Sequence, residues 1–223
     1  LGHHMMKRTC TNQVNLDFYS EDDMKDKYRL MLNLEGIATA IFANSPFDKK
    51  KISEYKSLRS HFWHHTDKNR TGLIPFVFEN DFNFEKYVEY ALDVPMYFII
   101  RDYKYINMTK YTFRDFFENK YKDDKTIQPT IDDWINHLST LFPQVRLKQF
   151  LEIRSMDACS WDLICSQPAF WIGILYNENS FNQAQELVEG WTQEDRNYIN
   201  EIAPKEGLQA KFKDGTILDL AQK

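Results

Sequence analysis

Residues 145–157 alternate between apolar and polar side chains, a pattern typical of a β-strand with one buried face. One face of this strand carries the apolar side chains of Val145, Leu147, Leu151 and Ile153. The other face carries Arg146, Lys148, Phe150, Glu152 and Arg154. Glu152 and Arg154 are two residues apart on that face, about 7 Å along a strand. This spacing suits a metal ligand beside a phosphate-binding guanidinium; a solvated strand face with an ion pair is the alternative.

Residues 9–18 repeat this design in a second predicted strand. The odd positions are all polar: Thr9, Thr11, Gln13, Asn15 and Asp17. The even positions are mostly apolar: Cys10, Asn12, Val14, Leu16 and Phe18. This pattern predicts an antiparallel sheet with one buried and one exposed face. Two strands with polar faces of this kind indicate a single sheet that lines a site.

Helical patterns cover much of the remaining chain. Ser20, followed by three acidic residues, predicts the start of a helix. We expect this helix to run through Leu34, to be interrupted at Gly36 and to continue over 37–42. A strand is expected over 95–105, with a turn at Asn107. Further helices are expected over 83–93, 113–117, 130–141, 161–176, 180–190 and 192–198.

Arg59 and Trp63 are four residues apart, so a helical turn would place them on one face. A guanidinium beside an aromatic ring can bind a carboxylate through two hydrogen bonds and shield it from water. The alternative is a surface arginine that packs its aliphatic stem on the tryptophan. Three histidines lie in the same stretch, but no cysteine or carboxylate stands at a metal-binding spacing from them. We therefore do not expect a metal site there.

The composition limits the classes of protein to which the chain can belong. The chain has 223 residues, 43% of them hydrophobic, which is enough for one folded domain over 1–223. Its net charge of −5 gives no reason to expect a nucleic-acid partner. No apolar run approaches the roughly 20 residues that span a bilayer, no signal peptide opens the chain, and the three cysteines fit a reducing compartment. We therefore expect a cytoplasmic protein with no membrane partner.

Seven sequence blocks carry a resemblance to a known family. They are RTCTNQVNLDF, IATAIFANSPF, SLRSHFW, TDKNRTGLIPFVFE, YVEYALDVPMYF, HLSTLFPQVRLKQFLEIRSMDA and PAFWIGILY. Together, in this order and over nearly the whole chain, they resemble plant-type glutamate–cysteine ligase. The resemblance implies an α+β fold related to glutamine synthetase, an antiparallel β-sheet funnel backed by helices. It also implies the first step of glutathione synthesis, in which ATP phosphorylates the γ-carboxylate of glutamate and the amine of cysteine attacks the acyl phosphate.

The resemblance implies ATP and Mg²⁺ as cofactors and assigns four residues to them. Glu152 is similar to a family ligand of magnesium at the ATP phosphates, and Arg154 to the residue that approaches the transferring phosphoryl group. Gln13 matches a metal-ligand position, and Asn15 matches a position near the nucleotide. The chemistry agrees, because a triphosphate needs cations held by oxygen ligands and phosphoryl transfer depends on electrostatic stabilisation.

The resemblance also implies residues for the substrates glutamate and cysteine. Arg59 resembles the residue that pairs with the α-carboxylate of glutamate, and Trp63 resembles its aromatic neighbour. Thr9 and Thr11 are expected to hydrogen-bond substrate. No residue identifies cysteine as the amine acceptor, so a related carboxylate–amine ligase with another acceptor is the alternative.

The chain departs from the family pattern in two places. It lacks the earlier strand whose E-H-E motif binds further magnesium, and the family continues beyond Lys223. We therefore expect the C-terminal part of a longer enzyme, with the N-terminal half as its partner; an inactive fragment that binds only nucleotide or a partner chain is the alternative. A redox-active cysteine pair of plant members aligns with Met108 and Asp123, so we expect no such switch. The cysteines present are then expected to be packed thiols: Cys10, Cys159 and Cys165.

Overall fold

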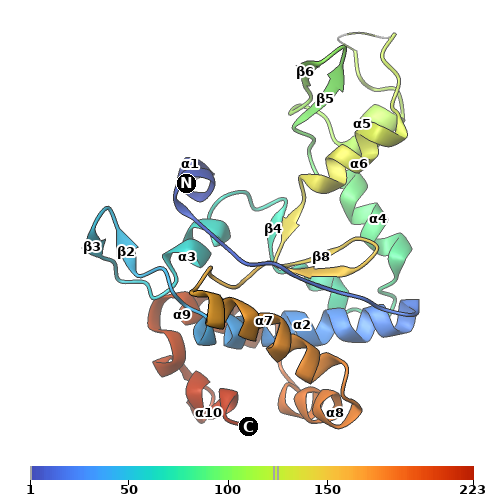
Figure 1. Ribbon diagram of the computed structural model, residues 1–223. Coiled ribbons are helices and arrows are strands. Elements are labelled where there is room, and N and C mark those ends of the chain that lie inside the picture. The colour runs from blue at the N-terminus through green and yellow to red at the C-terminus, as the bar shows by residue number, and fades with distance from the viewer. Residues whose placement is uncertain (1, 123, 125) are drawn as a thin grey trace.

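The computed structural model describes residues 2–122, 124 and 126–223, and Figure 1 shows a helical body from which a lobe projects. The helices are α1 Gly2–Arg8, α2 Glu21–Ile41, α3 Leu58–His64, α4 Phe84–Asp93, α5 Phe113–Phe117, α6 Ile131–Ser139, α7 Trp161–Leu175, α8 Glu178–Leu187, α9 Gln193–Glu206 and α10 Ile217–Ala221, with 3₁₀ turns η1 Pro75–Phe78 and η2 Gly207–Gln209. The strands are β1 Val14–Leu16, β2 Phe47–Asp48, β3 Lys51–Ile52, β4 Thr71–Gly72, β5 Phe98–Arg101, β6 Lys104–Asn107, β7 Phe142–Pro143, β8 Val145–Leu147, β9 Leu151–Ile153, β10 Lys211–Phe212 and β11 Gly215–Thr216.

Strands β1, β9 and β8 form an antiparallel sheet in that order. The residues paired across the sheet form rows of one character: Val14–Ile153–Val145 and Leu16–Leu151–Leu147 are apolar, and Asn15–Glu152–Arg146 is polar. Because successive residues of a strand face opposite sides, the apolar rows face the core and the polar row lies on the other face. The prediction that the two polar-faced segments share one sheet is confirmed.

The segment 145–157 is a hairpin rather than the single strand expected from the sequence. A short turn joins β8 to β9, and in it the Lys148 N–H donates to the Phe150 carbonyl at 2.9 Å. The register pairs odd residues with odd residues, so the alternation of faces survives the turn. The hairpin places Arg146 directly opposite Glu152, whereas a straight strand would hold them roughly 20 Å apart.

The predicted strand over 9–18 is shorter than expected. Regular pairing is confined to β1, and beyond it Thr11 forms an isolated bridge with Asp157. Helix α1 precedes this segment and ends at Arg8. The first strand therefore enters the sheet only where its apolar side chains, Val14 and Leu16, are buried.

Helix α2 lies beneath the sheet in the view of Figure 1 and is continuous. Ser20 caps it as predicted, because its hydroxyl accepts the Asp23 N–H at 3.1 Å. The predicted break at Gly36 is wrong. A β-carbon at Gly36 would lie 2.9 Å from Ile199 Cγ1 of α9, so the glycine allows the two helices to approach closely.

The main hydrophobic core lies between the sheet and the helices α2, α7 and α9. Tyr28 of α2 and Trp171 of α7 are fully buried in it. The Tyr28 hydroxyl donates to the Val145 carbonyl at 2.5 Å, which ties α2 to β8. This core fixes the apolar face of the sheet and leaves its polar face for the site described below.

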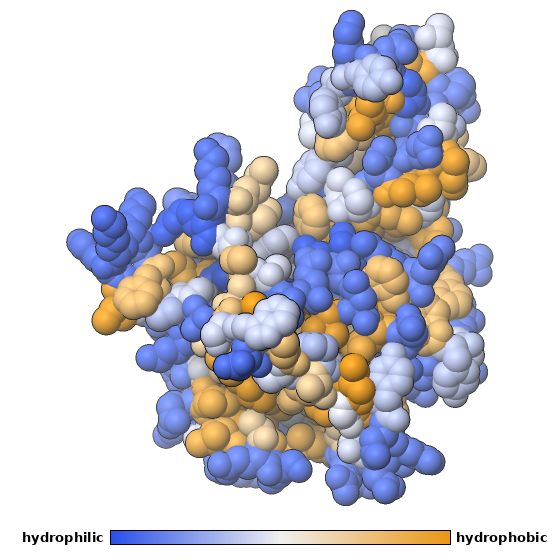
Figure 2. Space-filling view, in the orientation of Figure 1, coloured by the Kyte–Doolittle hydropathy of each residue, from blue (hydrophilic) through white to orange (hydrophobic). Residues whose placement is uncertain are grey.

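The projecting lobe contains β5, β6, α5 and α6, and α4 connects it to the body (Figure 1). It has its own hydrophobic cluster, which includes Met96, Met108 and Phe116. The strand expected over 95–105 is a hairpin whose turn residues Asp102 and Tyr103 have positive φ. Figure 2 shows apolar surface on this lobe among hydrophilic residues, and its exposed apolar side chains include Tyr105, Phe117, Ile131 and Ile135.

The mixture of helices and small, mainly antiparallel sheets confirms the α+β class. The funnel related to glutamine synthetase stays a prediction, as does a single domain over 1–223. Within 2–122, 124 and 126–223, no helix combines the length and hydrophobicity needed to cross a bilayer.

Candidate active site

Three cations surround Glu152 on the polar face of the sheet. Arg146 Nη2 donates to both carboxylate oxygens of Glu152, at 2.7 and 3.1 Å, and Arg154 Nη1 donates to one of them at 2.5 Å. The Lys148 ammonium lies 3.3 Å from the other oxygen. Glu152 and both arginines are buried, so the alternative of a solvated strand face is wrong. We call Arg146, Lys148, Glu152 and Arg154 the cation cluster.

The cation cluster carries more positive charge than its one carboxylate can balance. In the described part of the chain, each of the three cations forms an ion pair with Glu152 alone. Burial disfavours the ionised form of Glu152, but Arg146 and Arg154 outweigh burial and hold its pKa below the usual value. The cluster therefore has two more positive charges than negative ones, with the guanidinium groups buried and Lys148 exposed, which favours binding of an anion with several charges.

Arg59 and Trp63 lie on α3, as predicted, and α3 is hydrogen-bonded to the segment after β9. Ser57 caps this helix by accepting the Ser60 N–H. Arg59 is 3% exposed, and its Nη1 donates to the Ser155 carbonyl at 2.8 Å while Nη2 donates to the Arg154 carbonyl. Both terminal nitrogens of its guanidinium therefore bind the backbone after β9. Only Nε has no partner among the described residues.

This attachment brings the predicted carboxylate-binding pair next to the cation cluster. The guanidinium carbon of Arg154 lies 5.3 Å from the centre of the Trp63 ring, and that of Arg59 lies 5.8 Å from it. Asp157, also buried, lies 4.0 Å from Arg59 and accepts hydrogen bonds from Ser45 and Ser57. Arg154 is therefore shared between the cluster and the surroundings of Trp63.

A narrow cavity of about 20 Å³ lies between α2, α3 and the segment after β9. Nine buried side-chain atoms of the described residues have no hydrogen-bond partner, and six of them belong to residues that line this cavity. These six are Glu35 Oε2, Arg59 Nε, Trp63 Nε1, Gln144 Oε1, Arg154 Nε and Ser155 Oγ. Because buried polar groups are normally hydrogen-bonded, their concentration here indicates a place for a polar ligand group. We call it the Trp63 cavity.

Four residues of the first strand were predicted for the site. Two of them are exposed on the polar face, and the other two donate hydrogen bonds to backbone carbonyls. Asn15 is exposed and directly opposite Glu152 in the sheet, and Gln13, two residues earlier, is also exposed. The Thr11 hydroxyl donates to the Met156 carbonyl at 2.6 Å. The Thr9 hydroxyl donates to a backbone carbonyl of α1, so this side chain is engaged away from the sheet.

The oxygen ligands on this face suit a partial magnesium site. Glu152 offers one carboxylate and Gln13 one amide oxygen, and magnesium usually binds one or two carboxylates together with substrate phosphates and water. No group of three or more His, Cys, Asp or Glu side chains among the described residues could hold a metal by itself. The oxygen ligands described here are too few to hold magnesium without phosphates, and Glu152 would have to exchange a contact with Arg146 or Lys148 for the ion.

Two residues of the site were missed by reasoning from the sequence. Arg146 was placed on the polar face without a role, because only the hairpin sets it against Glu152. Glu35 lies at helical spacing from Met31 and Ala38, both apolar and fully buried. That spacing is the signal that could have identified Glu35 as a buried carboxyl group.

The three cysteines are less buried than expected. Cys10 and Cys165 are exposed and Cys159 is half-buried, so the expectation of packed thiols is wrong for the first two. Met108 lies in the hydrophobic cluster of the lobe. Asp123, the other position aligned with the redox pair, lies outside the described residues.

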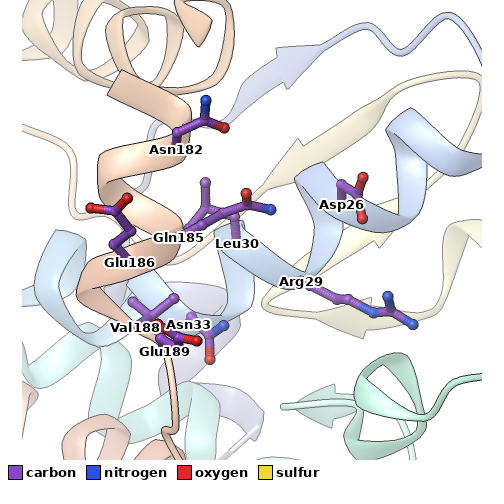
Figure 3. Close-up of a pocket in the computed structure, with 9 residues that line it drawn as sticks. All are labelled: Asp26, Arg29, Leu30, Asn33, Asn182, Gln185, Glu186, Val188 and Glu189. Atoms are coloured by element: carbon purple, nitrogen blue, oxygen red, sulfur yellow. The ribbon is translucent and has the colours of Figure 1, made fainter. Parts of the chain in front are cut away.

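A second, open groove lies between α2 and α8 (Figure 3). Asp26 and Arg29 reach it from α2, and Asn182, Gln185 and Glu186 reach it from α8. It shares no lining residue with the Trp63 cavity or with the cation cluster. Of the two places, only the Trp63 cavity contains residues predicted for the active site.

Comparison with known proteins agrees with the resemblance. A model of glutamate-cysteine ligase family 2 matches residues 1–223. Over 222 residues, the chain is 52% identical to chloroplastic glutamate–cysteine ligase B of Oryza sativa subsp. japonica, and it is 51% and 50% identical to the chloroplastic enzymes of Solanum lycopersicum and Arabidopsis thaliana. Each comparison covers 100% of this chain but only 45%, 42% and 42% of the respective relative. The chain therefore spans less than half the length of these relatives.

The names of the relatives also correct one expectation. All of these relatives are named chloroplastic, which contradicts the expected cytoplasmic location and points to the plastid.

The match over the whole chain, at about half identity, decides the family. This chain belongs to glutamate–cysteine ligase family 2.

Proposed function

We propose that this chain contributes the active site of an ATP-dependent ligase that joins the γ-carboxylate of glutamate to the amine of cysteine. The observation that carries the proposal is the position of Arg154. Its Nη1 donates to Glu152 in the cation cluster, and its side chain also lines the Trp63 cavity. A reaction that phosphorylates a carboxylate needs a phosphate site and a carboxylate site side by side, and Arg154 joins two such places.

The reaction proceeds in two steps. A γ-carboxylate oxygen of glutamate attacks the γ-phosphorus of ATP, the bond to the β-phosphate oxygen breaks, and ADP leaves with that electron pair. The amine of cysteine then attacks the acyl carbon, the acyl–oxygen bond breaks, inorganic phosphate leaves and the amine gives up a proton. Both steps concentrate negative charge on phosphate oxygens, which positively charged groups stabilise.

The cation cluster is the proposed binding site for the phosphates. The two unbalanced positive charges would attract the triphosphate, and Arg154 would stabilise charge on the transferring group. Asn15 is proposed to contact the nucleotide, because it lies opposite Glu152 in the sheet. Magnesium, held by Glu152 and Gln13 together with phosphate oxygens, would neutralise further charge on the triphosphate.

The Trp63 cavity is the proposed site for the α-carboxylate of glutamate. Arg59 and Trp63 both line it, and Arg59 Nε and Trp63 Nε1 are buried N–H groups without a partner in the described part of the chain. Thr11 is proposed to contact substrate through a hydroxyl that already donates to the Met156 carbonyl and can still accept. The Thr9 hydroxyl donates to a carbonyl of α1, so a contact between Thr9 and substrate stays a prediction from the resemblance. With an oxygen of the α-carboxylate in the Trp63 cavity, Arg154 would lie beside both the glutamate and the phosphates.

Release of ADP that depends on glutamate tests this proposal. It is measured with cysteine and with a panel of other amines, on the chain alone and on the chain mixed with a polypeptide that covers the rest of a relative's length. We expect ADP release in the mixture, greatest with cysteine. A preference for another amine would indicate a related carboxylate–amine ligase. ATP binding without ADP release in the mixture would indicate a protein that only binds nucleotide, and it would contradict the proposal.

A further inference from the structure

Glu35 is a buried carboxyl group at the wall of the Trp63 cavity. Its side chain comes from α2 and is 1% exposed. Thr39, one turn further along the helix, donates its hydroxyl to Oε1 at 3.1 Å. Oε2 has no partner in hydrogen-bond geometry among the residues that the structure describes, although the Ser155 hydroxyl is close enough to act on the pKa of Glu35. A carboxyl oxygen this deeply buried without a partner is costly unless a ligand or a proton satisfies it.

The surroundings favour the protonated form of Glu35. Burial raises its pKa to about 8, although Thr39, Arg59 and Ser155 act in the opposite direction. At neutral pH the carboxyl group therefore keeps its proton, and a protonated carboxyl group donates one hydrogen bond. Since Oε1 accepts from Thr39, the unpartnered Oε2 is the oxygen available to carry that proton.

The Trp63 cavity then contains more free donors than free acceptors. Arg59 Nε, Trp63 Nε1 and Arg154 Nε each present an N–H, and neutral Glu35 adds an O–H. Gln144 Oε1 is an acceptor, and the Ser155 hydroxyl can act in either sense. A cavity of about 20 Å³ has room for one oxygen-sized group. The complementary group is an oxygen that only accepts hydrogen bonds, as in a carboxylate.

We propose that Glu35, in its neutral form, donates a hydrogen bond to an oxygen of the substrate α-carboxylate in the Trp63 cavity. This inference rests on the proposed function, in which Arg59 and Trp63 bind the same carboxylate. Glu35 thereby determines which charge the cavity accepts, because an ionised Glu35 would repel the substrate and lose its donor.

Among the described residues that line the cavity, Glu35 is the group whose charge changes near neutral pH. From α3, Arg59 and His64 face it: burial lowers the pKa of Arg59 to about 10 and that of His64 to about 4. The segment after β9 contributes Arg154 and, beside Arg59, Asp157. Helix α9 packs against α2 at Gly36 through the apolar side chain of Ile199. Between pH 7 and pH 9, the charge of the cavity therefore changes at Glu35.

Titration calorimetry of L-glutamate binding at pH 7 and pH 9 tests the inference. For the purified wild-type protein we expect the Kd to rise about tenfold, because most Glu35 is neutral at pH 7 and most is ionised at pH 9. For Glu35→Gln, whose amide cannot ionise, we expect the Kd at pH 9 to lie within about twofold of that at pH 7. Glu186→Gln, an exposed position in the groove of Figure 3, should keep the tenfold rise. Glutarate, which lacks an ammonium group, should follow the same pattern as glutamate.

Three results would overturn the inference. A wild-type affinity that is constant or improves from pH 7 to pH 9 contradicts it without any variant, even if Glu35→Gln does not fold. A tenfold rise that persists in folded Glu35→Gln places the titrating group elsewhere. Both of these results leave the proposed function standing. Absence of glutamate binding by the wild-type protein at both pH values overturns the inference, whereas ADP release in the mixture decides the proposed function.

Discussion

Arg59 combines a structural contact with a proposed ligand contact in one side chain. Its two terminal nitrogens bind backbone carbonyls after β9, and its Nε–H remains free in the Trp63 cavity. A lysine there would keep the charge but could not make the three contacts in the same plane. For Arg59→Lys we expect the Kd for glutamate to rise on the order of tenfold, measured by calorimetry at pH 7.

The control for this prediction is Arg101→Lys, because Arg101 pairs with Asp133 in the lobe. That variant should bind glutamate within about twofold of wild type. Equal glutamate affinity for Arg59→Lys and wild type would count against Arg59 as a ligand of the carboxylate.

Glu35 also makes a prediction about stability. Its pKa is raised to about 8 in the folded protein and returns to an ordinary value near 4.3 in the unfolded chain. Between these two values the folded state holds a proton that the unfolded state releases, so the stability that Glu35 contributes falls as the pH rises. We expect wild type to lose roughly 1 kcal/mol per pH unit or less relative to Glu35→Gln over that window.

Urea unfolding of both proteins at pH 5.5 and pH 8 measures this difference, and titrations common to both proteins cancel. A difference in unfolding free energy that is the same at the two pH values would mean that Glu35 is already ionised in the folded protein.

At the residue scale, the sequence allowed prediction of the charged face but not of its partners. Glu152 and Arg154 follow from strand alternation and from the resemblance. Arg146 could not be paired with Glu152 because the pairing depends on a turn between them. Glu35 was hidden because its role depends on what α3 and the segment after β9 place beside it.

Close packing of α2 on α9 depends on Gly36. A methyl group there would meet Cγ1 and Cγ2 of Ile199 at 2.9 and 3.0 Å and a backbone carbon at 3.3 Å, and a β-branched side chain cannot move far. Alanine gains about 1 kcal/mol of helix propensity over glycine, but overpacking costs about 1–3 kcal/mol. We expect Gly36→Ala to lower the free energy of unfolding by about 1 kcal/mol, measured by urea denaturation.

Gly173→Ala is the matched control. Gly173 is an exposed residue of α7, and among the described residues no atom outside the neighbouring helix backbone lies within 4 Å of the place that a methyl group would take. The substitution therefore gains helix propensity without a clash, and it should raise the free energy of unfolding by roughly 0.5–1 kcal/mol. If both variants were stabilised, α2 and α9 would not be in close contact at Gly36.

Element boundaries were the part least accessible from the sequence. The turn at 148–150 contains no glycine or proline, and its register preserves the alternation of faces, so a hairpin and a single strand have the same pattern. The prediction of a break at Gly36 is wrong for a related reason. Glycine weakens a helix locally, but the contact with Ile199 decides the outcome, and that contact is distant in sequence.

At the scale of the molecule, the site is open on the side of the first strand. Asn15 and Gln13 are exposed, and the magnesium ligands described on this face are too few to hold the ion without phosphates. The chain also spans less than half the length of its relatives. We therefore expect turnover to require the rest of that length, while binding of a carboxylate oxygen of glutamate in the Trp63 cavity depends on residues of this chain.

In the proposed mechanism Arg154 joins the phosphate site to the carboxylate site, and its removal should therefore affect both. The decisive quantity is the rate of glutamate-dependent ADP release by Arg154→Ala, in the mixture described under Proposed function. Lys120→Ala serves as the control, since Lys120 pairs with Asp115 and Glu118 in the lobe. We predict a loss of turnover on the order of 10³ for Arg154→Ala and a change within about twofold for the control. Turnover of Arg154→Ala close to that of wild type would mean that Arg154 does not join the two sites.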